Sequence, residues 1–186
     1  MNTNHRYDVE LNQHYSAMWG QRSAQYTWDR GRALPQWCQV FEYAPSEKTF
    51  CWVYATCGMT PVAEPTSLEL FLMSRCQVEE HVELLTAIAD YHQTGARLGL
   101  GHTVNFGRPW LKDSQCSFGL ISLPYPFGPA LENAQAAGKT VRVLWLLPIT
   151  EAERSFKIAS GLSALEELFE KRQFNCLDPM RPSVVE

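Results

Sequence analysis

The stretch FCWVYATCGMT, residues 50–60, decides how the surrounding chain folds. It is apolar at both alternating sets of positions, which is typical of a central strand covered on two faces. Gly58 lies within it near its end and Pro61 directly follows it, and these residues commonly end strands. A second apolar run, LELFLMS, starts at Leu68 after a short link. Because parallel neighbours need a long crossover, the short link predicts that the two strands pair antiparallel.

The residues after these strands have the spacing of a helix. In QVEEHVELLTAIADYHQTG, residues 77–95, apolar side chains recur every three or four positions and acidic side chains take the opposite face. Gly95 is expected to end this helix. Further strands are expected over 102–106, 117–123 and 140–148.

Both ends of the chain also carry helical signals. A helix over residues 5–19 should stop at Gly20, and a half-buried strand is expected in LPQWCQVFEYAP, residues 34–45. Near the C-terminus, Thr150–Glu153 and Ser163–Glu166 both have the spacing of a capping box, so each predicts the start of a helix.

The order of these elements is helix, strands, helix, strands and helices. This order favours an α+β fold, a mixed, largely antiparallel sheet with helices packed on it, rather than a doubly wound sheet. We expect a single domain over residues 1–186. It would have a helix at 5–19, a core at about 34–172 and a C-terminal tail at 173–186.

Composition excludes several classes of protein. The formal net charge of −4 argues against a nucleic-acid partner, which attracts basic surfaces. No apolar run reaches the roughly 18 residues that span a bilayer, and the first residues lack the features of a secretion signal. We therefore expect a cytoplasmic protein without membrane contact, and the six cysteines are expected to be reduced and structural.

The glycine-rich stretch GLGHTVNFGRPWL, residues 99–111, could be mistaken for a phosphate loop. A dinucleotide-binding loop needs G-x-G-x-x-G between a strand and a helix, but Val104 takes the place of the third glycine and a strand follows. A P-loop would need Lys and Ser or Thr after its last glycine. The stretch is interpreted as a turn into a strand, and no cofactor is expected.

The same stretch and the residues after it also offer a catalytic alternative. His102 could act as a base for Ser114 or Cys116, with Asp113 or Asp90 orienting it. The sequence around Ser114 is not G-x-S-x-G, however, and a structural role for His102 is favoured over a partner-facing or catalytic one. No metal site is expected, because the histidines are too widely spaced and no paired C-x-x-C motifs occur.

Five motifs in order carry a resemblance to a known family. They are TCGMT at 56–60, LELFLMS at 68–74, LLTAIADYHQTGARLGLGHTV at 84–104, SFGLISLPYP at 117–126 and VRVLWLLPITEAE at 141–153. Together they resemble the suppressor of fused (SUFU) domain family, bacterial single-domain type, from about Trp37 to Phe169.

The resemblance implies a non-enzymatic protein-binding domain. Bacterial single-domain members are viewed as immunity proteins that neutralise a polymorphic toxin. The second domain of the animal members is not expected here, so their clamp between domains is not carried over. A peptide-binding regulator of the suppressor of fused type remains the alternative, and a hydrolase using His102 with Ser114 or Cys116 is less favoured.

Neutralisation would proceed by binding and occlusion of a cognate toxin. Tight interfaces depend on a few buried aromatic anchors, and an acidic surface would speed the capture of a basic partner. An exposed sheet edge could also accept a strand from the partner. The candidate partner-binding residues are Trp52, Tyr54, His102, Trp110 and Tyr125.

Overall fold

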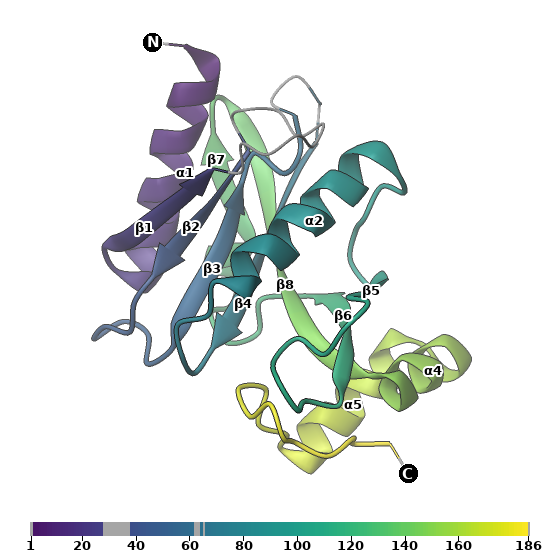
Figure 1. The fold of residues 1–186 in the computed structure, drawn as a ribbon. Helices are drawn as coiled ribbons and strands as arrows, with labels where there is room; N and C mark the ends of the chain where they lie inside the picture. Colours follow the sequence, from purple (N-terminus) through teal and green to yellow (C-terminus); the bar gives the residue numbers. More distant parts are fainter. Residues whose placement is uncertain (1, 28–37, 62–63, 65, 186) are drawn as a thin grey trace. The chain divides into compact units, whose positions relative to one another are not determined.

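A computed structural model describes residues 2–27, 38–61, 64 and 66–185. The chain divides into two compact units, which are described in turn. Unit 1 comprises Met1–Gly99 and Leu123–Trp145, and unit 2 comprises Leu100–Ser122 and Leu146–Glu186. The elements are α1 (Thr3–Trp19), β1 (Arg22–Thr27), β2 (Gln39–Tyr43), β3 (Trp52–Cys57), β4 (Ser67–Ser74), α2 (Glu80–Thr94), β5 (Thr103–Asn105), β6 (Cys116–Ser122), α3 (Pro129–Glu132), β7 (Asn133–Ala136), β8 (Lys139–Thr150), α4 (Glu151–Ser160) and α5 (Leu162–Arg172) (Figure 1).

The sheet of unit 1 has the strand order β1-β2-β3-β4-β8. The first four strands pair antiparallel with their neighbours. For β3 and β4 this is the pairing that the short link between them predicted. β4 and β8 are parallel, because the chain crosses over through α2 before it returns. β7 pairs antiparallel with the beginning of β8. The predicted mixed, largely antiparallel sheet is therefore confirmed.

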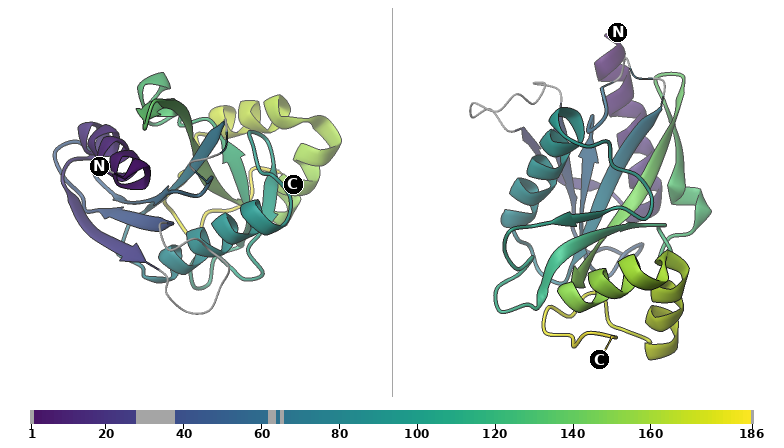
Figure 2. Two further views of the ribbon diagram at one scale, coloured as in Figure 1. Left: turned by 90° about the horizontal axis from the view of Figure 1, so that it is seen from above. Right: turned by 90° about the vertical axis from the view of Figure 1, so that its right-hand side faces the viewer.

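Two helices cover opposite faces of this sheet (Figure 2). On one face Trp19 of α1 packs 5.5 Å from the ring of Phe71, measured between ring centroids. Tyr54 lies beside Leu72, one residue from the pair of Ala55 and Phe71, so its side chain takes the other face. There its ring meets His81 of α2 edge-on, with 5.4 Å between centroids. The central strands β3 and β4 are consequently buried on both faces, as expected from their apolar runs.

Unit 2 is built on the second part of β8, which is followed in the sheet by β6 and β5. β5 pairs antiparallel with β6, and the Arg154 guanidinium of α4 lies over the Phe118 ring of β6 at 5.0 Å. The predicted capping box at Thr150 and Glu153 is present and starts α4. Its two hydrogen bonds satisfy backbone groups that a helix end leaves open.

The second predicted capping box is wrong. α5 begins at Leu162, with Gly161 as the residue that precedes it, so Ser163 lies inside the helix and caps nothing. Gly161 has a φ of 93°, a conformation that glycine adopts without strain, and the chain turns there between α4 and α5. The spacing that forms a capping box at Thr150 and Glu153 therefore forms none at Ser163 and Glu166, because Gly161 already marks the helix boundary.

Other elements escaped the sequence prediction. The polar residues of β1 form an edge strand whose exposure alternates along its length. α3 and β7 replace an expected loop, and Ala137 and Gly138, both at positive φ, turn the chain from β7 into β8. Residues 34–37 of the strand predicted at 34–45 lie outside the described residues, and β2 begins at Gln39.

Both glycines that were expected to end a helix lie at a helix end. Gly20 and Gly95 follow α1 and α2 directly, and the backbone N–H of each donates to the preceding helical turn. Among the described residues, no helix combines the length and apolar character that a membrane span requires.

Candidate functional site

The structure separates the five residues expected at a binding surface into two groups. Tyr125 has 57% of its surface exposed, His102 is exposed and Trp52 is half-buried. Tyr54 and Trp110 are core residues instead. Apolar spacing alone placed these two rings on strands and turns, but it did not show that other elements cover them.

The buried Tyr54 side chain links β3 to the segment that leads into α2. Its hydroxyl accepts a hydrogen bond from the backbone N–H of Val78 at 2.7 Å, two residues before α2 begins at Glu80. Burial raises the pKa of this phenol well above its ordinary value. Tyr54 therefore holds the start of α2 against β3 and offers no ring face to a partner.

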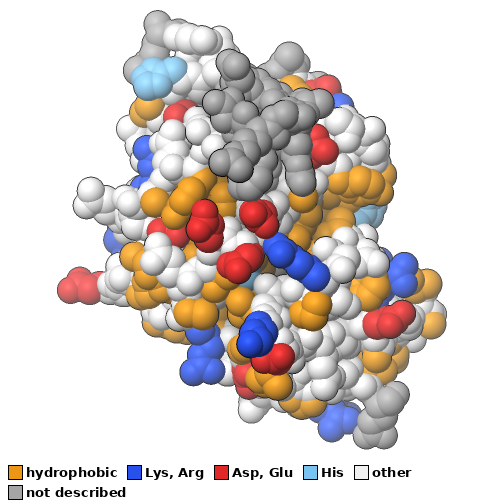
Figure 3. Space-filling view, in the orientation of Figure 1, with side chains coloured by type: hydrophobic (Ala, Val, Ile, Leu, Met, Phe, Trp, Pro, Cys, Tyr) orange, Lys and Arg blue, Asp and Glu red, His pale blue; other side chains and the backbone are white. Residues whose placement is uncertain are grey.

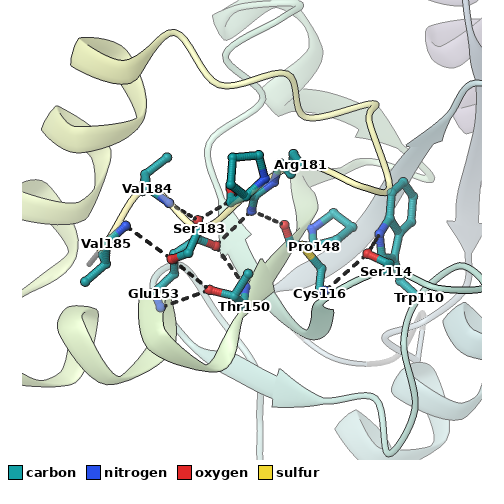
Figure 4. A network of polar contacts seen from close by, with 11 residues as sticks. Trp110, Ser114, Cys116, Pro148, Thr150, Glu153, Arg181, Ser183, Val184 and Val185 are labelled. Atoms are coloured by element: carbon teal, nitrogen blue, oxygen red, sulfur yellow. Dashed lines mark hydrogen bonds and ion pairs between the residues drawn. The ribbon is translucent and has the colours of Figure 1, made fainter.

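Trp110, Ser114 and Cys116 form a closed turn rather than a nucleophile site (Figure 4). The Ser114 hydroxyl accepts hydrogen bonds from Trp110 Nε1 at 3.0 Å and from the Cys116 backbone N–H at 3.1 Å. Cys116 is buried, and burial raises the pKa of its thiol, which disfavours the reactive thiolate. Among the described residues the exposed His102 side chain forms no hydrogen bond with Ser114 or Cys116. The arrangement is that of a structural turn.

A buried ion pair occupies the neighbouring part of unit 2 (Figure 4). The Arg181 guanidinium donates to both carboxylate oxygens of Glu153, from Nη1 to Oε1 at 2.6 Å and from Nη2 to Oε2 at 2.8 Å. Nη2 also donates to the Pro148 carbonyl at 3.0 Å. The backbone N–H groups of Thr150 and Val184 complete the shell of Glu153. Burial would raise the pKa of Glu153, but the hydrogen bonds and charge of Arg181 outweigh it and hold the pKa below its ordinary value. The pair fastens the C-terminal tail to the start of α4 and leaves no open position for a ligand.

Unit 1 contains a second buried carboxylate, Glu69 of β4. It accepts hydrogen bonds from Tyr7 Oη at 2.7 Å, Thr56 Oγ1 at 2.5 Å, and the backbone N–H groups of Gly58 at 2.7 Å and Met59 at 3.1 Å. Burial raises its pKa in spite of these four donors. Because Tyr7 lies on α1, the carboxylate joins that helix to the sheet and has a structural role.

Neither carboxylate belongs to a metal site. Within residues 2–27, 38–61, 64 and 66–185, no group of three or more His, Cys, Asp or Glu side chains is placed to hold an ion. All six cysteines are free thiols, and four of them are buried. Their thiols pack in the interior as small apolar groups.

Apolar side chains on the surface are the remaining candidates for function. Single exposed apolar residues are common, so those held in place by the surrounding structure carry more weight. Among the described residues, Phe50 is the most exposed of the large apolar ones, with 82% of its surface accessible. In the part of the chain that the structure describes, the exposed large apolar residues are Phe50, Tyr91, Tyr125, Ile158 and Met180.

Phe50 lies on the tip of the β2–β3 hairpin, residues 46–51, which we call the hairpin tip. Ser46 Oγ donates to the Trp19 carbonyl at 2.9 Å and accepts from the Lys48 backbone N–H at 3.1 Å. Lys48 Nζ donates to the carbonyls of Ser16 and Ala17, at 3.3 and 3.1 Å. An ammonium at the end of α1 is favourable, because the helix dipole is negative there. These bonds fasten the hairpin tip to α1.

The side chains on either side of Phe50 point inward. Thr49 has 4% and Cys51 has 1% of its surface exposed, and their side chains lie 3.5 Å apart at Oγ1 and Sγ. With both neighbours buried, the Phe50 ring is held toward solvent. Sequence reasoning missed this residue because it opens the apolar run FCWVYATC and was counted within the strand.

The outward face of α2 is acidic. Glu79, Glu80 and Glu83 are exposed and Asp90 is half-buried, and residues 79–94 contain no Lys or Arg. We call these four residues the acidic face of α2. Figure 3 shows acidic side chains gathered over this helix, with hydrophobic side chains beside them.

Comparison with known proteins agrees with this fold. The family model described as Suppressor of fused protein (SUFU) matches residues 35–182. A crystal structure of a SUFU homologue from Neisseria gonorrhoeae shares 34% identity with this chain, covers 97% of each chain and superimposes with a TM-score of 0.85. A search of the curated proteins found no match.

Two more distant structures share the fold. The Sufu–Fu complex structure matches with 15% identity over 96% of this chain and 92% of that chain, with a TM-score of 0.66. Drosophila Suppressor of Fused matches with 14% identity and a TM-score of 0.68, over 96% of this chain and 51% of that chain.

Proposed function

Because this chain belongs to the suppressor of fused family, we propose that it works by binding another protein. A distant structural relative was solved as the Sufu–Fu complex, so the fold is compatible with a protein partner. The observation that carries the proposal is the contrast between its apolar surface residues and its candidate nucleophiles. Phe50 faces solvent from a hydrogen-bonded hairpin, whereas Ser114 and Cys116 are buried in a closed turn.

We further propose that the chain is an immunity protein that neutralises a polymorphic toxin in the cytoplasm. It would bind the toxin and cover the surface that the toxin needs for its activity. The six free thiols suit a reducing compartment, and the net charge of −4 favours capture of a basic toxin. A binding protein of this kind needs no catalytic group of its own.

Affinity capture followed by a growth test examines both parts of the proposal. The tagged full chain is incubated with lysate of its source organism at physiological salt, and bound proteins are identified by mass spectrometry. We expect one stoichiometric partner whose expression alone arrests growth, and co-expression of this chain should restore it. The matched control is the chain carrying Glu167→Lys and Glu170→Lys on the exposed face of α5, which should rescue equally.

Two results would redirect the proposal. A stoichiometric partner without toxicity would retain protein binding but replace the immunity role by a peptide-binding regulatory one. Failure to retain any protein would contradict protein binding itself, and the hydrolase hypothesis with His102 would then be tested by substitution to Asn.

A further inference from the structure

We infer that the hairpin tip, with Phe50 at its surface, and the acidic face of α2 together form the surface that contacts the partner, and that the partner is a basic protein. This inference rests on the proposed protein-binding function and assigns it a surface and a partner chemistry.

Hydrogen bonds and buried neighbouring side chains hold the hairpin tip in place. Binding affinity is reduced by the entropy of ordering loops and side chains at an interface. Here Ser46 and Lys48 already tie the tip to α1, and Thr49 and Cys51 are buried on both sides of the exposed ring. Phe50 therefore presents a large apolar side chain with little ordering left to occur when a partner binds.

The second step is the continuity between the tip and α2. Antiparallel pairing of Trp52 with Ser74 brings the start of β3 and the end of β4 to the same end of the sheet. The chain leaves Ser74 for α2, and Val78 is bonded there to Tyr54, two residues from the half-buried Trp52. Figure 1 shows the hairpin and the link into α2 at this end of unit 1. Phe50 and Trp52 thus lie at the end of the sheet where α2 begins.

The third step is the location of the charge. The described part of unit 1 carries eleven acidic and seven basic residues, and four of the acidic ones form the acidic face of α2. The described part of unit 2 carries seven of each. The acidic excess of the described residues therefore lies in unit 1, where α2 and the residue before it carry four acidic residues and no Lys or Arg.

This distribution of charge favours a basic protein as the partner over a second copy of the chain. A second copy of the chain in a symmetric dimer would place the acidic face of α2 against itself, and like charges across an interface are unfavourable. A protein with exposed Lys or Arg side chains and an apolar pocket for a phenyl ring complements the surface. Long-range attraction between such surfaces also raises the association rate, which an inhibitor of a toxin requires.

The test replaces Phe50 by the photo-crosslinker p-benzoylphenylalanine in the full chain. The matched control carries the crosslinker in place of Ile158, which is 62% exposed on α4 in unit 2. Both proteins are irradiated in lysate of the source organism, and the adducts are mapped by mass spectrometry. We expect an adduct at position 50 only, formed with a protein segment rich in Lys and Arg.

Charge reversal is the second arm. Glu79→Lys with Glu80→Lys should lower the yield of the adduct at position 50 at least ~10-fold, because attraction becomes repulsion. Glu167→Lys with Glu170→Lys changes the net charge equally and should leave the yield unchanged. Circular dichroism establishes that each variant is folded. On the captured partner, Phe50→Ala should weaken affinity by about 30-fold, as expected for a hot-spot residue.

The outcomes separate this inference from the proposed function. An adduct at position 158 only, an adduct between two copies of this chain, or an adduct at position 50 that survives charge reversal would overturn the inference. If affinity capture yields a partner but position 50 forms no adduct, the inference fails while protein binding stands. If neither experiment yields a partner, both fail.

Discussion

Two fully buried carboxylates, Glu69 in unit 1 and Glu153 in unit 2, are stabilised in different ways. Neither has any exposed surface, and each accepts several hydrogen bonds. The donors to Glu69 are neutral, whereas Glu153 is gripped by the Arg181 guanidinium. Burial therefore raises the pKa of Glu69, while Arg181 holds that of Glu153 low.

The difference shows what hydrogen bonds can and cannot do for a buried charge. Four neutral donors satisfy the lone pairs of Glu69, yet burial still raises its pKa. At Glu153 a cation with matching geometry outweighs burial and lowers the pKa. Each carboxylate also fastens one end of the chain, since Tyr7 belongs to α1 and Arg181 to the C-terminal tail. The comparison can therefore be tested through those two partners.

Removing the cation should have the largest effect. Arg181→Met leaves the Glu153 carboxylate buried without its partner, and breaking a buried pair in this way destabilises by about 3–5 kcal/mol. The free energy of unfolding is measured by urea denaturation. Lys171→Met, at an exposed position of α5, is the control and should change it little. A loss below about 1 kcal/mol for Arg181→Met would contradict the assigned role of the pair.

Removing one neutral donor should have a smaller effect. Tyr7→Phe keeps the ring but deletes the hydroxyl bonded to Glu69, and a hydrogen bond to a charged group contributes about 2 kcal/mol. Tyr26→Phe is the matched control, because Tyr26 donates to Glu42 at 3.1 Å from a half-exposed position on β1. Equal losses for the two variants in urea denaturation would show that burial of the Tyr7 side chain adds nothing.

The capping box tests whether Glu153 is held by more than Arg181. Thr150→Ala removes the hydroxyl that accepts from the Glu153 backbone N–H and should lower the free energy of unfolding by about 1 kcal/mol. Ser163→Ala should have almost no effect, because Ser163 lies inside α5. The melting temperatures of the two variants provide the measurement, and equal shifts would refute the assigned helix boundary.

Lowering the pH should change the contributions of Glu153 and Glu69 to the free energy of unfolding in opposite directions. The pKa of Glu153 is lowered on folding, so its stabilising contribution is present above the unfolded pKa and is lost as pH falls through the folded pKa. The pKa of Glu69 is raised on folding, so stability is gained as pH falls through its folded pKa toward its unfolded value. In urea midpoints from pH 7 to pH 4, the advantage of wild type over Glu153→Gln should shrink and that over Glu69→Gln should grow. Parallel trends would contradict the comparison.

Sequence patterns predicted the fold better than the surface. Apolar runs at 50–60 and from Leu68 gave buried strands with the expected antiparallel pairing, because strand period and link length are local properties. The capping signal worked at Thr150 and failed at Ser163, where Gly161 sets the helix boundary.

Placement of the aromatic anchors depended on long-range contacts that no local pattern contains. Tyr54 is covered by α2 and Trp110 is turned onto Ser114. Phe50 belongs to the same apolar run as Tyr54, yet it is exposed because its two neighbours are buried instead. The alternation of side chains along this run identified a strand correctly. It did not show at which residue other elements begin to cover the strand.

The alternation of the two units along the chain has a consequence for protein synthesis. Unit 1 is interrupted by Leu100–Ser122, and its final segment ends at Trp145 within β8. A ribosome making this chain releases the first segment of unit 2 before unit 1 is complete. The parallel partner of β4 becomes available only after most of the polypeptide has been made. The nascent chain must therefore hold an unfinished sheet edge while it grows, and truncation at residue 99 would leave that edge exposed.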